Sequence, residues 1–244
     1  MKSCVIVTGG SRGIGNKIVK KLLKEKISVI YTYQHNSLSH HELETLAYNH
    51  QVTCLKYQLD QSKSDEVIKF YNWVLTQCEH IDGFINNAGI SKSNLVINIS
   101  DEEWQKVIDV NLTGPFYMVR AFARKLMEQR EGFIINIAST TGMDGGIGIS
   151  NYAASKGGLI AFSKSIGFEL ARFGIRNYII APGYIDTEML MEIEDAKMKH
   201  VKESIQLGRL GMPEEIAELV SFLIKGKNYI QNTVIRADGG LVNK

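Results

Sequence analysis

The chain has 244 residues, enough to bury one large hydrophobic core but short for two independent domains. Apolar residues make up 44% and charged residues 22%, which fits a globular protein and excludes a disordered or fibrous one. The formal net charge of +2 indicates neither a nucleic-acid nor a membrane partner, because such partners require a dense stripe of like charges.

The first residues run directly into a strand-like apolar segment, residues 4–7, which leaves no room for a signal peptide. No apolar stretch approaches the roughly 20 residues that span a bilayer. Cys4, Cys54 and Cys78 are odd in number and lack metal-ligand spacing, so we expect free thiols and neither disulfides nor a metal site. The sequence therefore predicts a cytoplasmic protein.

Short runs rich in Val, Ile and Phe alternate with longer helical patterns along the chain, as in a parallel sheet buried on both faces. The predicted strands are residues 4–8, 27–32, 52–58, 82–86, 132–138, 175–181 and 233–237. Helix-start signals lie between them: Ser100 with Glu103 forms a capping box, and Pro213 suits a first helical turn. Right-handed crossovers then give one α/β domain over residues 1–244, a doubly wound, seven-stranded Rossmann sheet with its ligand site at the strands' carboxyl ends.

A glycine-rich turn, residues 8–15, leads from the first strand into the helical pattern of residues 17–26. Unpaired backbone N–H groups and the helix dipole at such a turn favour a pyrophosphate, which glycines allow to approach closely. The spacing G-x-x-x-G-x-G differs from the G-x-G-x-x-G fingerprint, so a tight turn without a ligand is the alternative. The candidate cofactor contacts in this turn are Gly9, Ser11, Arg12, Gly13, Ile14 and Gly15.

The segment after the second strand indicates which dinucleotide binds. Rossmann proteins that select NAD carry an acidic residue there, whereas residues 31–36 hold none. Arg12 can pair with a 2′-phosphate, its alternative being a solvated surface charge, so we expect NADPH as the cofactor. Asp60, after the third strand, either accepts from the adenine amino group or caps a helix that begins near Ser62.

Strand 132–138 delivers Ser139 at its carboxyl end, and Tyr152 and Lys156 share one face of the following helix at i and i+4. An unperturbed tyrosine pKa of about 10 is too high for catalysis near neutrality, and we expect the lysine ammonium to lower it. Tyr152 then protonates a developing alkoxide that Ser139 also hydrogen-bonds, while Lys156 holds the nicotinamide ribose. A Tyr-x-x-x-Lys pair alone is common on helix surfaces, but Ser139 and the glycine turn make chance implausible.

Residues 187–208 depart from the alternation of strands and helices. They form an amphipathic insertion that includes Met189, Met191 and Met198. Flexible thioether side chains adapt to apolar ligands, so one interpretation is a substrate lid. Ordinary helical packing is the other interpretation.

Together these motifs resemble the short-chain dehydrogenase/reductases over essentially the whole chain. The turn at 8–15 matches the family's cofactor loop, and Ser139, Tyr152 and Lys156 match its catalytic residues. The resemblance gives Asn111 a fourth catalytic role, holding a water that relays protons from Lys156, although an Asn before Pro115 can also simply bend a helix. It implies further cofactor contacts from the segments at 86–89 and 182–187, namely Asn87, Ala88, Gly89, Pro182, Gly183, Ile185 and Thr187.

Within the family, residues 152–159, 208–215 and 238–240 most resemble the 3-oxoacyl-[acyl-carrier-protein] reductases, although sugar, polyol and steroid dehydrogenases share these segments. The likeness implies NADPH-dependent reduction of a carrier-bound 3-oxoacyl thioester to the 3-hydroxyacyl thioester during acyl-chain synthesis. It implies a homotetramer that uses the helices at about 101–129 and 151–173. Because carrier proteins are acidic, docking is expected at Arg130 and at Arg172, with Phe173 in the second expected position.

Two positions differ from the reductase pattern. Ile149 stands where these enzymes often carry Gln, which predicts a more apolar pocket, and Asn232 replaces a turn glycine whose left-handed backbone Asn tolerates. We hypothesise a specialised member that acts on an unsaturated or aromatic acyl chain. Two alternatives stay open: a carbonyl reductase for a free ketone, sugar or steroid, and a non-catalytic sensor of nicotinamide redox state on a retained fold.

Overall fold

The computed structural model of the chain describes residues 1–35, 39–190, 195–226 and 228–242. A parallel sheet of seven strands runs through its centre in the order β3-β2-β1-β4-β5-β6-β7. The strands are β1 Ser3–Val7, β2 Val29–Tyr33, β3 Cys54–Gln58, β4 His80–Asn86, β5 Gly132–Ile137, β6 Ile175–Pro182 and β7 Val234–Ala237. The order reverses where β1 adjoins β4, and a doubly wound sheet binds its ligand at the carboxyl ends beside such a point. The predicted fold class and strands are confirmed.

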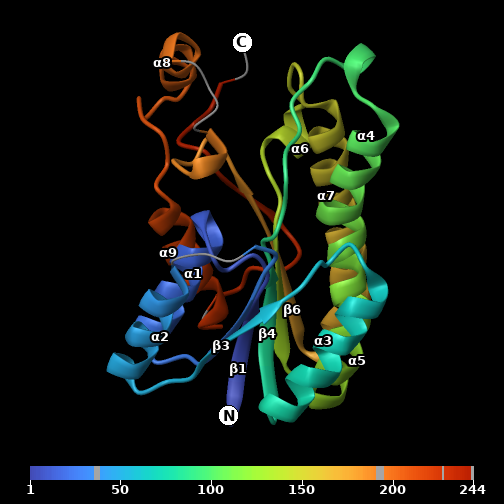
Figure 1. Cartoon of the computed structure of the whole chain (residues 1–244), viewed down its shortest axis with the longest axis vertical. Helices are drawn as coiled ribbons and strands as arrows, with labels where there is room; N and C mark the ends of the chain where they lie inside the picture. The colour runs from blue at the N-terminus through green and yellow to red at the C-terminus, as the bar shows by residue number, and fades with distance from the viewer. Residues whose placement is uncertain (36–38, 191–194, 227, 243–244) are drawn as a thin grey trace.

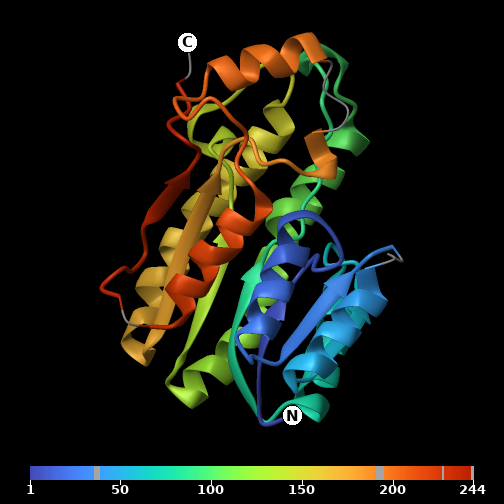
Figure 2. The same cartoon turned by 90° about the vertical axis from the view of Figure 1, so that its left-hand side faces the viewer.

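Helices cover both faces of the sheet, so the molecule has three layers (Figure 1). One face carries α1 Gly13–Lys24, α2 Ser39–His50 and α9 Pro213–Ile224. The other carries α3 Ser64–Gln77, α4 Asp101–Ile108, α5 Gly114–Gln129 and α7 Ser150–Leu170. Two shorter helices, α6 Thr141–Asp144 and α8 Asp195–Glu203, lie at the carboxyl-end edge, and Figure 2 shows α8 crossing the top of the molecule.

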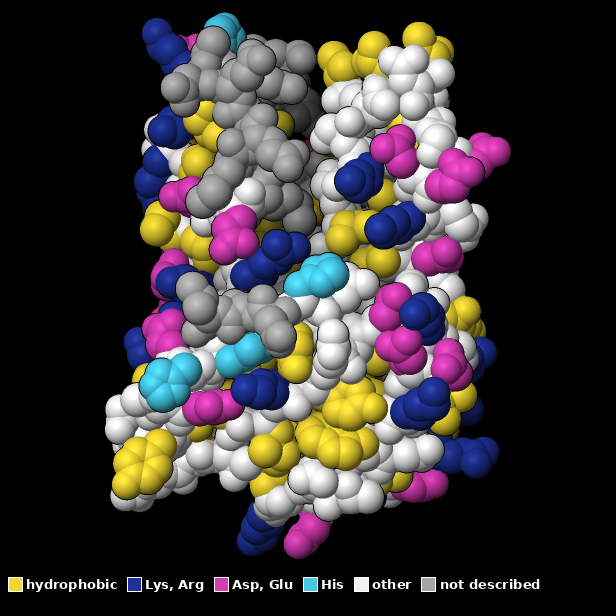
Figure 3. Space-filling view, viewed as in Figure 1, with side chains coloured by type: hydrophobic (Ala, Val, Ile, Leu, Met, Phe, Trp, Pro, Cys, Tyr) yellow, Lys and Arg dark blue, Asp and Glu magenta, His cyan; other side chains and the backbone are white. Residues whose placement is uncertain are grey.

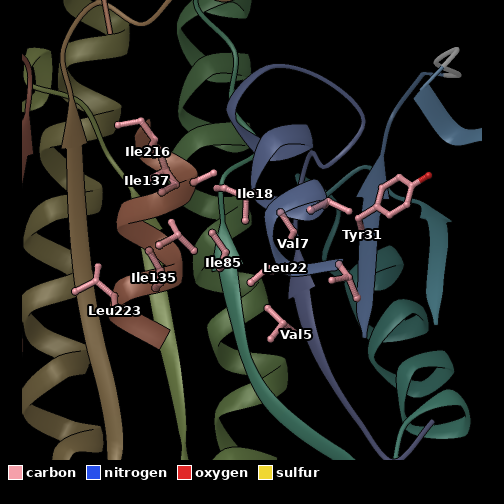
Figure 4. Close-up of a cluster of buried hydrophobic side chains, with 14 of the residues drawn as sticks. Val5, Val7, Ile18, Leu22, Tyr31, Ile85, Ile135, Ile137, Ile216 and Leu223 are labelled. Atoms are coloured by element: carbon pink, nitrogen blue, oxygen red, sulfur yellow. The ribbon is translucent and has the colours of Figure 1, made fainter. Parts of the chain in front are cut away.

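Alternate residues of the strands belong to two different apolar clusters. Val5 packs toward α1 and α9 in the cluster drawn in Figure 4, whereas its neighbour Ile6 packs toward α3 and α5. Ile135 and Ile134 divide in the same way. Because both faces of the inner strands are buried, β1, β2, β5 and β6 read as mostly apolar runs instead of alternating ones, whereas the edge strands β3 and β7 are partly exposed.

The helix-start signals are confirmed in atomic detail. Ser100 Oγ accepts from Glu103 N at 3.1 Å, and Glu103 Oε2 accepts from Ser100 N at 3.4 Å, so the capping box is complete. Pro213 is the first residue of α9. The Asn232 backbone has a φ of +54°, so the predicted left-handed turn is also present.

The long helix predicted over 101–129 is interrupted. Residues Asp109–Thr113 form a π-helical turn, η2, between α4 and α5. Pro115 has no N–H, so the regular helical bond to the Asn111 carbonyl cannot form, and the wider turn accommodates its absence. Asn111 thus lies where the regular helix is interrupted before Pro115, and this position does not exclude a catalytic role.

The insertion at 187–208 contains a 3₁₀ turn, η4 Glu188–Leu190, and α8. Met191 and residues 192–194 lie outside the described residues. Val201 and Ile205 are buried, so the described end of the insertion packs on the rest of the molecule. Within the described part of the chain, no helix is both long and apolar enough to cross a membrane. Acidic and basic side chains are interspersed over the described part of the face in Figure 3, in keeping with the small net charge.

Candidate active site

The segment after β4 holds the glycine turn after β1. Thr8 Oγ1 accepts from the backbone N–H groups of Asn87 and Ala88, each at 3.0 Å. Asn87 Nδ2 returns two bonds, to the Thr8 carbonyl at 2.9 Å and the Gly9 carbonyl at 3.2 Å. The two predicted cofactor segments therefore form one continuous surface beside the reversal point of the sheet.

The glycine turn fits a dinucleotide phosphate. Gly9 and Gly13 have φ values of +66° and +53°, and a Cβ atom on Gly15 would collide with the Gly9 carbonyl. The first N–H groups of α1 receive no side-chain cap from Arg12, the N-cap residue, so they can meet an anion. Thr187 lies across the turn, its Cγ2 atom 3.7 Å from where a Gly13 Cβ would be. The predicted contacts at 9–15 and Thr187 are thus brought together.

Arg12 and Asp60 have protein partners. Arg12 Nη1 lies 3.7 Å from Glu188 Oε2, and both side chains are exposed. Asp60 Oδ1 accepts from Ser62 N at 3.1 Å and Ser62 Oγ at 2.6 Å, and α3 begins at Ser64. Asp60 thus closes a turn before α3, but it does not cap the helix, because the N-cap residue is Lys63 and the helix has no side-chain cap bond. The capping interpretation of Asp60 is therefore wrong. Asp60 lines a shallow pocket with Gln34 and Val110, which is compatible with contact to an adenine.

Ser139, Tyr152 and Lys156 converge at the carboxyl end of β5. Ser139 directly follows the Ala138 that continues β5, and α7 presents Tyr152 and Lys156 on one side. Lys156 Nζ lies 5.7 Å from the Tyr152 ring centre and donates to the Ile137 carbonyl at 2.8 Å. Ser139 and Lys156 are buried, with 8% and 4% of their surfaces exposed. Buried polar groups in this arrangement can bind a carbonyl oxygen and move a proton.

Burial sets the protonation of this group. It raises the pKa of Tyr152 above the ordinary tyrosine value, and a side-chain hydrogen bond with Ser139 acts in the opposite direction. Burial also lowers the pKa of Lys156 to about 8. The expectation that the lysine lowers the tyrosine pKa is therefore wrong for this arrangement, because the amine bonds to a carbonyl and desolvation of the phenolate dominates.

Asn111 is fully buried and faces the same centre. Its Oδ1 accepts from Ile90 N at 2.9 Å, and its Nδ2 donates to the Ile90 carbonyl at 2.8 Å and to Ser155 Oγ at 3.0 Å. A Cβ atom on Gly89 would lie 3.2 Å from Asn111 Oδ1 and 3.4 Å from Lys156 Nζ. Asn111 therefore fixes the segment after β4 beside Lys156.

The segment after β6 completes the site. Thr140 N donates to the Pro182 carbonyl at 3.0 Å, and Gly183 N donates to the Ala237 carbonyl at 3.0 Å. Ile185 is buried and bridges to Gly211. Pro182 thus lies beside the loop that carries Ser139, while Gly183 and Ile185 are held by the segments at Ala237 and Gly211.

Gln61 is a site residue that the sequence reasoning missed. It is 5% exposed, and its Nε2 donates to the Ala88 carbonyl at 3.2 Å and the Val110 carbonyl at 2.8 Å. It thereby joins the loops after β3 and β4 to the π turn that carries Asn111. Its place in the short segment between β3 and α3 was the one available signal.

The two arginines predicted to dock a carrier protein lie together but far from this centre. Arg130 precedes β5, and Arg172 lies in η3 Ala171–Phe173 before β6. Because β5 and β6 are parallel, both arginines are at the amino ends and Ser139 is at a carboxyl end, on the order of 20 Å away along β5. The expectation that they lie at the mouth of this chain's own site is wrong.

Comparison with known proteins agrees with this geometry. Residues 3–198 match the family described as short chain dehydrogenase. The chain is 38% identical over 237 residues to the 3-oxoacyl-[acyl-carrier-protein] reductase FabG of Chlamydia trachomatis, covering 97% of this chain and 96% of that protein. It is 35% identical over 237 residues to the 3-oxoacyl-[acyl-carrier-protein] reductase FabG of Aquifex aeolicus, which covers 97% of this chain and 96% of that protein. It is also 35% identical over 239 residues to the 3-oxoacyl-[acyl-carrier-protein] reductase of Synechocystis, with 97% of this chain and 96% of that protein covered. The strand order reverses beside a glycine turn, and Ser139, Tyr152 and Lys156 lie at the carboxyl ends of the strands near that point. Together with the family match, this shows that the chain belongs to the short-chain dehydrogenase family.

Proposed function

We propose that the protein reduces a carrier-bound 3-oxoacyl thioester to the 3-hydroxyacyl thioester with NADPH. The observation that carries the proposal is the convergence of Ser139, Tyr152, Lys156 and Asn111 beside a turn that fits a dinucleotide phosphate. Family membership implies a nicotinamide cofactor. The names of the similar proteins support the thioester substrate and its carrier.

When bound, NADPH supplies the hydride that adds to the carbonyl carbon. Tyr152 donates its phenolic proton to the carbonyl oxygen, and its raised pKa keeps that proton in place until the oxygen becomes basic. Ser139 donates a hydrogen bond to the same oxygen and stabilises its growing negative charge.

Lys156 and Asn111 complete the proton path. The Lys156 pKa of about 8 allows the amine to hold or release a proton near neutrality, and in its charged form it binds the ribose hydroxyls. Asn111 Oδ1 accepts one bond from Ile90 and has a second lone pair, which can hold the relay water next to Lys156.

NADPH is favoured over NADH by the charges around the turn. The Arg12 guanidinium can pair with a 2′-phosphate. To do so it must separate from Glu188, and this loses little free energy because exposed ion pairs contribute little to stability. The backbone around Pro182, Gly183, Ile185 and Thr187 is the proposed contact for the nicotinamide end. The insertion at 187–208 acts as a lid over the substrate.

Exposed apolar loops support an apolar acyl chain as substrate. Asn94 N donates to the Gly148 carbonyl at 2.8 Å and so joins the loop at 94–98 to the loop before Tyr152. On these loops Ile97 is 84% exposed and Ile147 is 93% exposed. Together with Ile149, they favour an unsaturated or aromatic chain over a short one.

Carrier docking at Arg130 and Arg172 requires a second copy of the chain. Since both arginines lie at the amino ends of the strands, they serve the active site of a neighbouring subunit in a homotetramer. Exposed Trp104, Phe116 and Phe168 on α4, α5 and α7 support subunit contacts there. The three free thiols support a cytoplasmic location.

Product analysis tests the proposal. The protein is incubated with NADPH and a 3-oxoacyl thioester, carrier-bound or free, and the product is identified by mass spectrometry. We expect a 3-hydroxyacyl thioester heavier by two hydrogen atoms. Parallel incubations contain a sugar, a steroid or a simple ketone in place of the thioester. Reduction of one of these with the thioester left unchanged would overturn the substrate assignment, and NADPH binding without any reduction would favour a sensor.

A further inference from the structure

An ionic cluster joins the two sides of the active site. Arg236, on β7, holds Asp144 with two bonds: Nη2 lies 2.9 Å from Oδ2, and Nη1 donates to Oδ1 at 3.2 Å. The same guanidinium donates to Asp238 Oδ2 from Nε at 2.9 Å and Nη2 at 2.8 Å. The three side chains are 35%, 24% and 10% exposed, so water only partly screens them. Because a guanidinium is planar and its N–H groups point in set directions, Arg236 fixes the orientation of the two carboxylates as well as their distance from it.

On one side the cluster reaches Ser139 through α6, which is only four residues long. Asp144 is its last residue, and Thr141, its first, donates from its backbone N to Ser139 Oγ at 3.1 Å. In the middle of α6, a Cβ atom on Gly142 would lie 2.6 Å from the Lys156 backbone carbonyl carbon. A shift of Asp144 therefore moves the element that orients the Ser139 hydroxyl and packs on Lys156.

On the other side the cluster reaches the segment after β6. A Cβ atom on Gly183 would lie 2.6 Å from Asp238 Cβ, so the two backbones are in close contact. Asp238 Oδ1 accepts from Gly240 N at 3.1 Å, which fixes the carboxylate. Arg236 thus ties the loop of Ser139 to the segment proposed to contact the nicotinamide.

We propose that Arg236 is a positioning residue for the reduction, acting through Asp144 and α6 on the Ser139 hydroxyl. The role rests on the proposed function, since Ser139 is assigned there as the donor to the carbonyl oxygen. The hydrogen bond from Ser139 to the carbonyl oxygen strengthens as negative charge grows on that oxygen in the transition state. A displaced Ser139 hydroxyl therefore lowers kcat more than it raises KM.

Steady-state kinetics with NADPH and a small 3-oxoacyl thioester test this role. We expect Arg236→Gln and Asp144→Asn each to lower kcat about tenfold at nearly constant KM, and the double variant to lose no more than either alone. Arg236→Lys keeps the charge without the paired geometry and should give an intermediate kcat. The control is Lys56→Gln, which breaks the partly exposed 2.9 Å pair with Glu44 on β3 and α2 and should leave kcat unchanged.

Amide hydrogen exchange of residues 139–149 gives a readout that needs no turnover. We expect faster exchange there in Arg236→Gln and Asp144→Asn than in the wild type or Lys56→Gln. Wild-type kcat in both cluster variants, independent losses that multiply in the double variant, or unchanged exchange would overturn the proposal. An inactive wild type would instead count against the proposed function, while the exchange comparison still decides whether Arg236 positions α6.

Discussion

Tyr152 shows how burial determines the chemistry of a single residue. Its pKa is raised by desolvation, so the phenol holds its proton at neutral pH and acts as an acid toward an oxygen that becomes basic. A side-chain hydrogen bond with Ser139 lowers the Tyr152 pKa and so partly opposes this shift. The pair therefore suits reduction of a carbonyl group.

Removing the phenolic hydroxyl tests the proton donor. We expect Tyr152→Phe to lower kcat by at least about 100-fold, because general acid catalysis contributes that much, with NADPH affinity largely kept. Steady-state rates and fluorescence titration with NADPH measure the two quantities. Tyr48→Phe, at an exposed position on α2, is the matched control. Near-wild-type turnover by Tyr152→Phe would refute the assignment.

Lys156 should reduce stability at neutral pH. Its folded pKa of about 8 lies below its ordinary value of 10.5, so the unfolded chain binds more protons between these values. The cost of burying the amine is therefore fully present below pH 8 and disappears as the pH rises toward 10.5. We expect Lys156→Met to unfold with a larger free energy than the wild type at pH 7, by up to about 3 kcal/mol.

Urea denaturation of both proteins at pH 7 and pH 10 measures this difference. The advantage of Lys156→Met should shrink at the higher pH, whereas effects of pH on the rest of the chain cancel between the two proteins. A difference that stays constant, or a less stable variant at pH 7, would contradict the lowered pKa of Lys156.

For single residues, the sequence predicts which ones lie in the site better than it predicts which atoms they contact. Ser139 follows a strand and Tyr152 and Lys156 repeat at helical spacing, so local pattern alone brings them together. The bond from Lys156 to Ile137 depends on how α7 packs against β5, and that packing reverses the expected direction of the tyrosine shift. Arg236 and Asp144 are 92 residues apart, and no spacing rule relates them.

At the scale of elements, Gln61 joins three segments of the site. Its amide can only donate to the Ala88 and Val110 carbonyls, because the reverse orientation would place oxygen against oxygen. We expect Gln61→Leu to lower the free energy of unfolding by about 1 kcal/mol, since two partly buried carbonyls lose a partner. It should also raise the KM for NADPH, because Ala88 and Gly89 lose their anchor.

Thermal unfolding and initial rates over a range of NADPH concentrations measure both effects. Gln77→Leu provides a control at a glutamine in the last turn of α3, whose amide donates to Thr76 Oγ1 at 2.9 Å. An unchanged KM in Gln61→Leu, or equal effects of the two substitutions, would show that Gln61 does not hold the cofactor segment.

The elements themselves were largely predictable. The strands and the Ser100 capping box follow from local composition and are present as expected. The π turn at Asp109–Thr113 was not predictable, because the apolar periodicity continues through it from α4 into α5. Only Asn111 before Pro115 indicates a break in the helix. The interior of the insertion at 187–208 stays a prediction.

For the whole molecule, the parallel sheet separates the two proposed binding functions. Chemistry lies at the carboxyl ends, whereas Arg130 and Arg172 lie at the amino ends. We expect Arg130→Ala combined with Arg172→Ala to raise the KM for a carrier-bound substrate severalfold, because charge pairs with an acidic carrier are lost. The KM for the same acyl group on a small thiol should not change.

Substitution of Lys24 on α1 and Lys69 on α3, which lie on different elements from Arg130 and Arg172, controls for net charge. Light scattering establishes whether the proteins are tetrameric, since the cross-subunit arrangement requires it. Equal loss with both substrates, or full docking by a monomer, would contradict the arrangement. The doubly wound parallel sheet was predictable from crossover rules, but the distance between the arginines and Ser139 required knowing which strand ends they occupy.

Initial rates of NADPH oxidation with a 3-oxoacyl-carrier-protein substrate test the central claim most directly. Parallel reactions replace NADPH with NADH and the thioester with a free ketone. We predict rapid oxidation of NADPH with the carrier-bound thioester, slower oxidation of NADH, and little activity on the ketone. Tight NADPH binding with no oxidation by the thioester, or faster reduction of the free ketone, would contradict the account.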